Sequence, residues 1–140
     1  MRKYSQSCPI ARTLDVIGDR WTLLIIRDLF MGSTKFGAFR QSSGIPPKVL
    51  SARLKSLLEN GIIEREVYSE HPLRAEYHLT ELGRSLLPIV LAIGMWGFEN
   101  TFAGEHDLRS AVADAVYENI PESRVMLEEA GIVIQRAAAD

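Results

Sequence analysis

The sequence has little cysteine and no long apolar run. Cys8 is its one cysteine among 140 residues, which excludes an internal disulfide framework and favours a reducing environment. The longest uncharged run, residues 85–98, has 14 residues and includes a proline and two glycines, whereas a membrane-spanning helix needs roughly 20 apolar residues. Arg2 and Lys3 precede no apolar segment. We therefore expect no secretory signal, no membrane association and a cytoplasmic location.

Patterns typical of catalytic and metal centres are also missing from the sequence. His71, His78 and His106 follow no zinc-binding spacing. Neither a nucleophile elbow nor a glycine-rich phosphate loop is found. We expect no enzymatic activity, no cofactor and no metal.

Acidic residues are missing from one stretch of the chain. Between Asp28 and Glu59 there is none, but there are five basic residues: Lys35, Arg40, Lys48, Arg53 and Lys55. The formal net charge of −2 is unusual for a nucleic-acid binder. However, residues 1–79 hold 12 Lys/Arg and 8 Asp/Glu, and residues 80–140 hold 4 and 10. The positive charge is concentrated in the first part of the chain.

The composition, 46% hydrophobic and 24% charged, is typical of a chain that buries a core. Apolar periodicity predicts helices over residues 9–17, 20–31, 35–41 and 47–59. Pro9 suits the first helical position, Asp19 an N-cap and Gly61 a C-terminal stop. The short third helix, a glycine-containing turn at residues 42–45 and the fourth helix together form the helix-turn-helix pattern.

Two alternating segments, residues 62–68 and 74–79, predict a β-hairpin with its tip at residues 69–73. A helix-turn-helix followed by a hairpin is typical of a winged helix. Thr80 is predicted to cap a long apolar helix over residues 81–102. Two shorter helices, over residues 105–119 and 121–130, and an apolar segment at 132–134 are expected to follow.

Several motifs, in this order, resemble those of the HxlR-type winged-helix transcriptional regulators, which are related to the MarR group. They cover residues 8–98 and are Cys8-Pro9-Ile10, Leu14-Asp15-Val16-Ile17-Gly18-Asp19-Arg20-Trp21, Lys48-Val49-Leu50-Ser51-Ala52-Arg53-Leu54, Leu58-Glu59-Asn60-Gly61-Ile62-Ile63-Glu64-Arg65 and Glu76-Tyr77-His78-Leu79-Thr80-Glu81-Leu82-Gly83. The resemblance implies a homodimer that binds a pseudo-palindromic DNA operator. Pro46-Pro47 stands where the family usually has Ser-Pro, so the serine N-cap is lost, which typically costs about 1 kcal/mol.

The predicted fold class is mainly α with a small β-hairpin. It is a winged helix-turn-helix DNA-binding domain with extra N- and C-terminal helices that form a dimer interface. We expect a DNA-binding and dimerisation domain over residues 8–102 and a helical extension over 103–140. The apolar helix 81–102 either completes the core or forms the dimer interface with the partner's first helix, and both roles are compatible.

The fourth helix is the predicted reader of double-stranded DNA in the major groove. Lys48 and Lys55 would contact phosphate or guanine, Ser51 a phosphate or a base, and Pro47 and Ala52 the methyl group of thymine. Arg40 would bind the DNA backbone from the preceding helix. The alternative is that these residues form an ordinary solvated basic face, used in a protein–protein interaction module.

Arg74 and Cys8 are two further candidates. Arg74, near the hairpin tip, would enter the adjacent minor groove, or else form a cross-strand ion pair with Glu64 or Glu66. Cys8 lies at a helix N-terminus, where the dipole favours the reactive thiolate. In several members of the family this cysteine senses oxidants or electrophiles, so the resemblance implies a redox or small-molecule effector. The alternative is a buried, inert thiol.

Overall fold

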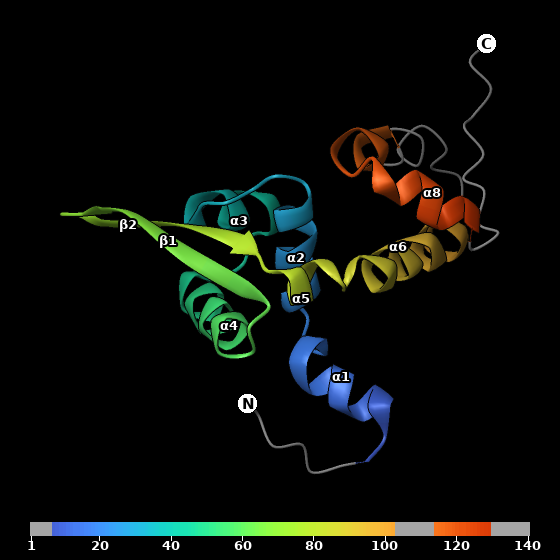
Figure 1. Ribbon diagram of the computed structural model, residues 1–140, viewed down its shortest axis with the longest axis horizontal. Helices are drawn as coiled ribbons and strands as arrows, with labels where there is room; N and C mark the ends of the chain where they lie inside the picture. The colour runs from blue at the N-terminus through green and yellow to red at the C-terminus, as the bar shows by residue number, and fades with distance from the viewer. Residues whose placement is uncertain (1–6, 103–113, 130–140) are drawn as a thin grey trace. The chain divides into compact units, whose positions relative to one another are not determined.

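The computed structural model describes residues 7–102 and 114–129 (Figure 1). The chain divides into two compact units, Met1–Ser85 and Leu86–Asp140. The first unit contains α1 (Pro9–Ile17), α2 (Thr22–Phe30), α3 (Phe36–Ser43), α4 (Pro47–Glu59), β1 (Ile63–Glu70), β2 (Leu73–Leu79) and α5 (Glu81–Arg84). The second contains α6 (Leu87–Thr101), a helical segment at residues 114–119 and α8 (Glu122–Glu129). A mainly helical chain with one two-stranded antiparallel sheet is the predicted fold class.

The core of the first unit lies among α2, α3 and α4. Each helix turns one apolar stripe inward, and the most deeply buried side chains are Ile25, Ile26, Phe39, Ile45, Leu50, Leu54 and Leu57. Burial of one such side chain stabilises the fold by about 1.5–3 kcal/mol. On α4, Leu50, Leu54 and Leu57 are buried, and Leu58 is half-buried. Phe36 at the start of α3 is half-buried too.

Most helix ends follow the predicted signals, but Asp19 is not the N-cap residue of α2: Trp21 holds that position, and Asp19 accepts the N–H groups of Trp21 and Thr22 from the preceding turn. Pro9 opens α1 and Gly18 caps its C-terminus. Gly44 joins α3 to α4 with a φ of 69°, a left-handed conformation that glycine adopts without steric cost. The second helix is shorter than predicted, because Arg20 and Trp21 form a turn before it.

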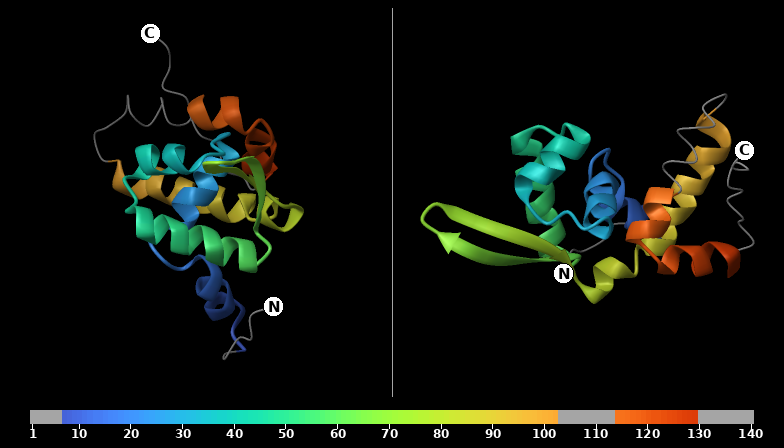
Figure 2. Two further views of the ribbon diagram at one scale, coloured as in Figure 1. Left: turned by 90° about the vertical axis from the view of Figure 1, so that its left-hand side faces the viewer. Right: turned by 90° about the horizontal axis from the view of Figure 1, so that it is seen from above.

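The hairpin is longer than predicted. β1 and β2 pair from Ile63 with Leu79 to Glu70 with Leu73, so that the tip consists of His71 and Pro72. A register shift between Val67 and Ser69 takes up the extra residue, and the ladder continues beyond it. The hairpin projects beyond α2–α4 as a two-stranded arm (Figure 2). This arm is the wing.

The predicted helix over residues 81–102 is wrong in one respect, because it is broken at Ser85 and Leu86. Pro88 explains the break: it has no N–H to donate to the carbonyl of Arg84, and it stands in the first turn of α6, where proline is tolerated. By length and composition alone, Glu81–Thr101 could cross a membrane. An apolar core helix passes the same test.

In the second unit, α6 and α8 contact one another. Leu87, Leu91, Met95 and Phe98 are the buried residues of α6, and Ile120 is buried just before α8. The predicted boundary between residues 102 and 103 stays a prediction. Most of the predicted helix 105–119 and all of the segment 132–134 lie outside the described residues.

Candidate nucleic-acid interface

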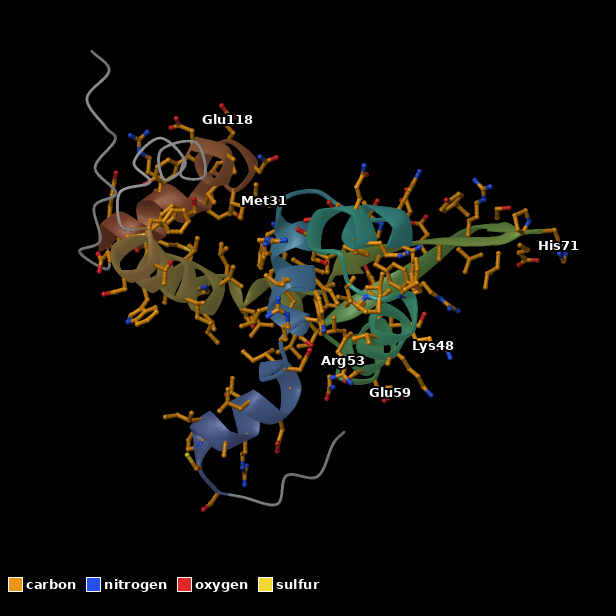
Figure 3. The ribbon with its side chains drawn as sticks, turned by 180° about the vertical axis from the view of Figure 1, so that it is seen from behind. Met31, Lys48, Arg53, Glu59, His71 and Glu118 are labelled. Carbon is orange, nitrogen blue, oxygen red and sulfur yellow. The ribbon has the colours of Figure 1, made fainter. Side chains whose placement is uncertain are left out.

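One face of α4 is apolar and buried, and the opposite face is exposed and carries the predicted DNA contacts. Leu50, Leu54 and Leu57 fix the inward face. Pro47, Lys48, Ser51, Ala52 and Lys55 are all exposed, and their spacing of i, i+1, i+4, i+5 and i+8 places them along one side of the helix. Figure 3 shows Lys48 pointing away from the body of the unit. The structure therefore brings these five predicted residues together.

Among the residues that the structure describes, no side chain caps the N-terminus of α4. Pro46 occupies the N-cap position, and its carbonyl accepts the N–H of Leu50 at 2.9 Å. Proline has no side-chain acceptor, so the first N–H groups of α4 keep their donor capacity. The end of a helix that carries free N–H groups attracts anions such as phosphate.

The five basic residues of the acid-free stretch fall into two groups. Lys35 places its Nζ 5.4 Å from the ring centroid of Tyr68 on the hairpin, and Arg53 pairs with Asp19. Among residues 7–102 and 114–129, no acidic side chain forms an ion pair with Arg40, Lys48 or Lys55. These three cations are therefore the ones available to phosphate.

Arg53 is turned toward the start of α2. Its Nη1 lies 3.5 Å from Oδ1 of Asp19. The carboxylate also accepts the N–H of Trp21 at 3.0 Å and that of Thr22 at 3.1 Å, together with the Thr22 hydroxyl. Burial acts to raise the pKa of Asp19, but the hydrogen bonds from Thr22 and Trp21 and the charge of Arg53 outweigh it and lower that pKa.

The hairpin is held against the helices along the outer edge of β2. Tyr77 donates its N–H to the carbonyl of Thr34 at 2.8 Å, and Lys35 forms a bridge with Glu76. The ring of Tyr77 meets Phe39 edge-on at 6.4 Å between centroids. These contacts were not predicted, because they join a loop to a strand that is distant in sequence.

Arg40, Arg74 and Cys8 lie on three other elements, and each is exposed. Arg40 is on α3. Arg74 is on β2 opposite Ser69, close to the tip that His71 marks in Figure 3. Within the described part of the chain, Arg74 forms no ion pair with Glu64 or Glu66, so the alternative interpretation of this residue gains no support. Cys8 is the N-cap residue of α1.

A second buried polar contact joins α2 to α3, and the sequence pattern did not reveal it. Oδ1 of Asp28 accepts the Ser42 hydroxyl at 3.0 Å, and the guanidinium of Arg27 donates both to this oxygen and to Ser42. The signal in the sequence was an acidic residue, Asp28, within the largely apolar helix α2. The contact fixes the end of α3 that leads into α4.

Residues 16–105 match the family model described as HxlR-like helix-turn-helix. The chain belongs to the HxlR-like helix-turn-helix family. The resemblance seen in the sequence motifs is thereby confirmed, and the winged-helix fold class agrees with it.

Relatives and solved structures support the family assignment. The uncharacterized HTH-type transcriptional regulator Mb3122 of Mycobacterium bovis is 44% identical over 90 residues, which cover 64% of this chain but only 57% of that protein. The crystal structure of PA1607 is 47% identical with a TM-score of 0.65, covering 71% of this chain and 70% of its own. The redox regulator HypR in its oxidized form is 41% identical with a TM-score of 0.62, and the match covers 66% of this chain and 97% of the HypR chain.

Proposed function

We propose that this HxlR-like protein is a sequence-specific, DNA-binding transcriptional regulator that acts in the cytoplasm as a homodimer on a pseudo-palindromic operator. The exposed face of α4 carries the proposal. It combines two cations, Lys48 and Lys55, with Ser51 and lies in a stretch without acidic residues. Phosphate contacts supply most of the affinity for DNA, and a helix face with polar side chains reads base edges.

The geometry supports a division of roles along α4 and the hairpin. The N-terminal part of α4, with Pro47, Lys48 and Ser51, would enter the major groove, and Ala52 would contact the methyl group of thymine. Lys55 and Arg40 would bind phosphates on either side of the groove. Arg74 on the projecting hairpin would enter the adjacent minor groove.

Exposed apolar side chains support the homodimer. Ile10 and Leu14 on α1 are 71% and 57% exposed, and Trp96 on α6 is 66% exposed. Large apolar side chains that gather on helices are typical of interaction surfaces. In a symmetric dimer the two α4 helices would stand one DNA turn apart, about 34 Å.

Cys8 is the proposed site of oxidant or electrophile input. The thiol is exposed, so it is accessible to small oxidants, and the alternative of a buried thiol does not fit this exposure. HypR, a structural relative, is named a redox regulator. Modification of Cys8 would shift the population between dimers that bind DNA and dimers that do not.

The deciding experiment is a mobility-shift titration on the DNA upstream of the gene at several salt concentrations. We expect a mobility shift, and the logarithm of the binding constant should fall linearly with the logarithm of the salt concentration. The reason is that the bound Lys and Arg side chains displace counterions from the phosphates. A missing shift, or one insensitive to salt, would contradict the proposal and favour a protein–protein interaction module.

A further inference from the structure

Two carboxylates and one imidazole lie together on one face of the hairpin. Glu66 is directly opposite Glu76 in the ladder, and His78 is two residues further along β2. Nε2 of His78 lies 3.8 Å from Oε2 of Glu66 and 3.7 Å from Oε2 of Glu76. One potential ligand atom from each residue lies within 4.8 Å of the others. The three side chains therefore converge on one point from two strands.

The spacing of these atoms fits a shared metal ion better than it fits hydrogen bonds. At 3.7 and 3.8 Å the two N···O separations exceed the hydrogen-bond range of about 2.7–3.2 Å. Zinc binds imidazole nitrogen and carboxylate oxygen at about 2.0–2.2 Å, which puts two ligands of one tetrahedral ion about 3.4 Å apart. The two N···O separations differ from that value by a few tenths of an ångström, and the two carboxylates lie within 4.8 Å of each other. Rotation of these side chains could bring all three ligands to one ion.

The electrostatics of this face also favour a cation. Two carboxylates directly opposite each other in an antiparallel pair repel. Within the described residues, the one charged group that pairs with Glu66 or Glu76 is His78, and its imidazole is charged only when protonated. A divalent cation would remove the repulsion and accept the unprotonated imidazole as a ligand.

The backbone around the cluster is held in place before any ion binds. Glu76 forms the bridge with Lys35, and the N–H of Tyr77, between Glu76 and His78, bonds to Thr34 at 2.8 Å. Both edges of β2 are therefore paired at this point. Two of the three ligands come from this fixed strand, which lowers the entropic cost of assembling the site.

We propose that Glu66, Glu76 and His78 bind one divalent transition-metal ion of the zinc type, with water completing its coordination. Imidazole favours zinc and its transition-metal neighbours over magnesium and calcium, which prefer all-oxygen sites. The expectation of no metal rested on the spacing between histidines along the chain. This site instead joins a single histidine to two glutamates across strands.

Zinc titration of the 140-residue chain with Cys8→Ser tests the proposal, because that background removes the thiol as a competing ligand. Isothermal calorimetry measures the affinity and NMR follows the imidazole resonances, both without DNA, so the result does not depend on the proposed function. We expect one zinc ion per chain, with the His78 resonances shifting first. His78→Ala and Glu76→Gln should each weaken zinc binding at least about tenfold. Loss of a residue that only orients a metal ligand lowers metal affinity by about that factor, and loss of the ligand itself should lower it no less.

His71→Ala and Glu64→Gln are the matched controls. His71 is exposed at the tip of the same hairpin, and Glu64 is directly opposite His78. Both controls should keep the affinity of the parent protein. Absence of saturable binding at micromolar zinc would overturn the proposal, and so would binding that survives both His78→Ala and Glu76→Gln. Glu76→Gln preserves shape, and unchanged thermal unfolding without metal would confirm that it folds.

Discussion

Arg53 in the middle of α4 reaches back to Asp19, with 3.5 Å between Nη1 and Oδ1. The contact connects the helix that is proposed to read DNA with the turn that starts α2. It also withdraws Arg53 from the set of cations that face outward. The ion pair thus adds to the buried leucines of α4 a polar link to the carboxylate that accepts the N–H groups at the start of α2.

Asp19→Ala should destabilise the protein more than Arg53→Ala does. Loss of Asp19 removes the acceptor of the N–H groups of Trp21 and Thr22, and loss of such a cap costs about 0.5–2 kcal/mol. Loss of Arg53 removes a partly exposed ion pair worth about 0.2–1 kcal/mol. Urea denaturation measures both free energies of unfolding. A larger loss in Arg53→Ala would contradict this ranking, because both variants break the ion pair, and would assign the difference to the packing of the Arg53 stem.

The contribution of Asp19 should depend on pH in a defined direction. Its pKa in the folded protein lies below the ordinary value of 3.8, so its charged form stabilises the fold. That stabilisation is complete above about 3.8, the value of the unfolded chain, and is lost as the pH falls through the lower, folded pKa. The difference in unfolding free energy between the wild type and Asp19→Asn should therefore shrink in strong acid. The exposed Glu59, replaced by Gln, is the control.

Lys48→Ala and Lys55→Ala should weaken binding to all DNA sequences to a similar extent. Each replacement removes one phosphate contact, so the slope of log K against log salt should decrease in magnitude by about 1. Ser51→Ala should instead reduce discrimination between operator and random DNA. Arg124→Ala, which removes a cation already paired with Glu128 at 3.5 Å, is the control. If Ser51→Ala lowers affinity uniformly and Lys48→Ala alters specificity, α4 enters the groove in another orientation.

Most of the helix-turn-helix could be predicted from local signals. Pro9, Gly44 and Gly61 end or begin elements where the sequence indicates, since their backbone restrictions act within one or two residues. The hairpin could not be delimited in the same way, because the register shift at Val67 is set by pairing with β2. The cluster of Glu66, Glu76 and His78 depends on that register too. Pairing across strands is therefore what the sequence pattern left undetermined.

Oxidation should change DNA binding through Cys8 alone. The thiol is exposed and has no second cysteine in the chain to pair with, so an oxidant would yield a sulfenic acid, a mixed disulfide or a link between subunits. Treatment with diamide should alter operator affinity in the wild type and leave Cys8→Ser unchanged, as a mobility shift would show. Equal binding before and after treatment of the wild type would exclude this input.

Trp96→Asp and Leu14→Asp should each shift the protein from dimer to monomer. Both side chains are large, apolar and more than half exposed, and a charge placed in an apolar interface leaves an unpaired buried group. Sedimentation velocity measures the result. Leu73→Asp is the control, since Leu73 is 64% exposed on the hairpin and outside the proposed interface. A dimer that tolerates the first two changes but not the third would place the interface on the hairpin.

Gly83→Ala should destabilise the protein strongly, because the added methyl group meets backbone. Thr80 donates its hydroxyl to the carbonyl of Gly61 at 2.6 Å and accepts the N–H of Gly83 at 3.1 Å. This network holds Gly83 against Ile62, the residue before β1, and a Cβ there would lie 2.1 Å from the carbonyl oxygen of Ile62. Because that atom belongs to the backbone, relief requires movement of the junction between α4 and the hairpin.

Gly94→Ala is the matched comparison for this prediction. Gly94 is also helical, but a Cβ would meet nothing within 4 Å, so alanine should stabilise α6 by about 0.5–1 kcal/mol through its helix propensity. Thermal unfolding should therefore move in opposite directions for the two variants. A small loss for Gly83→Ala would show that α5 moves away from Ile62 easily, and that the Thr80 network does not determine where the hairpin ends.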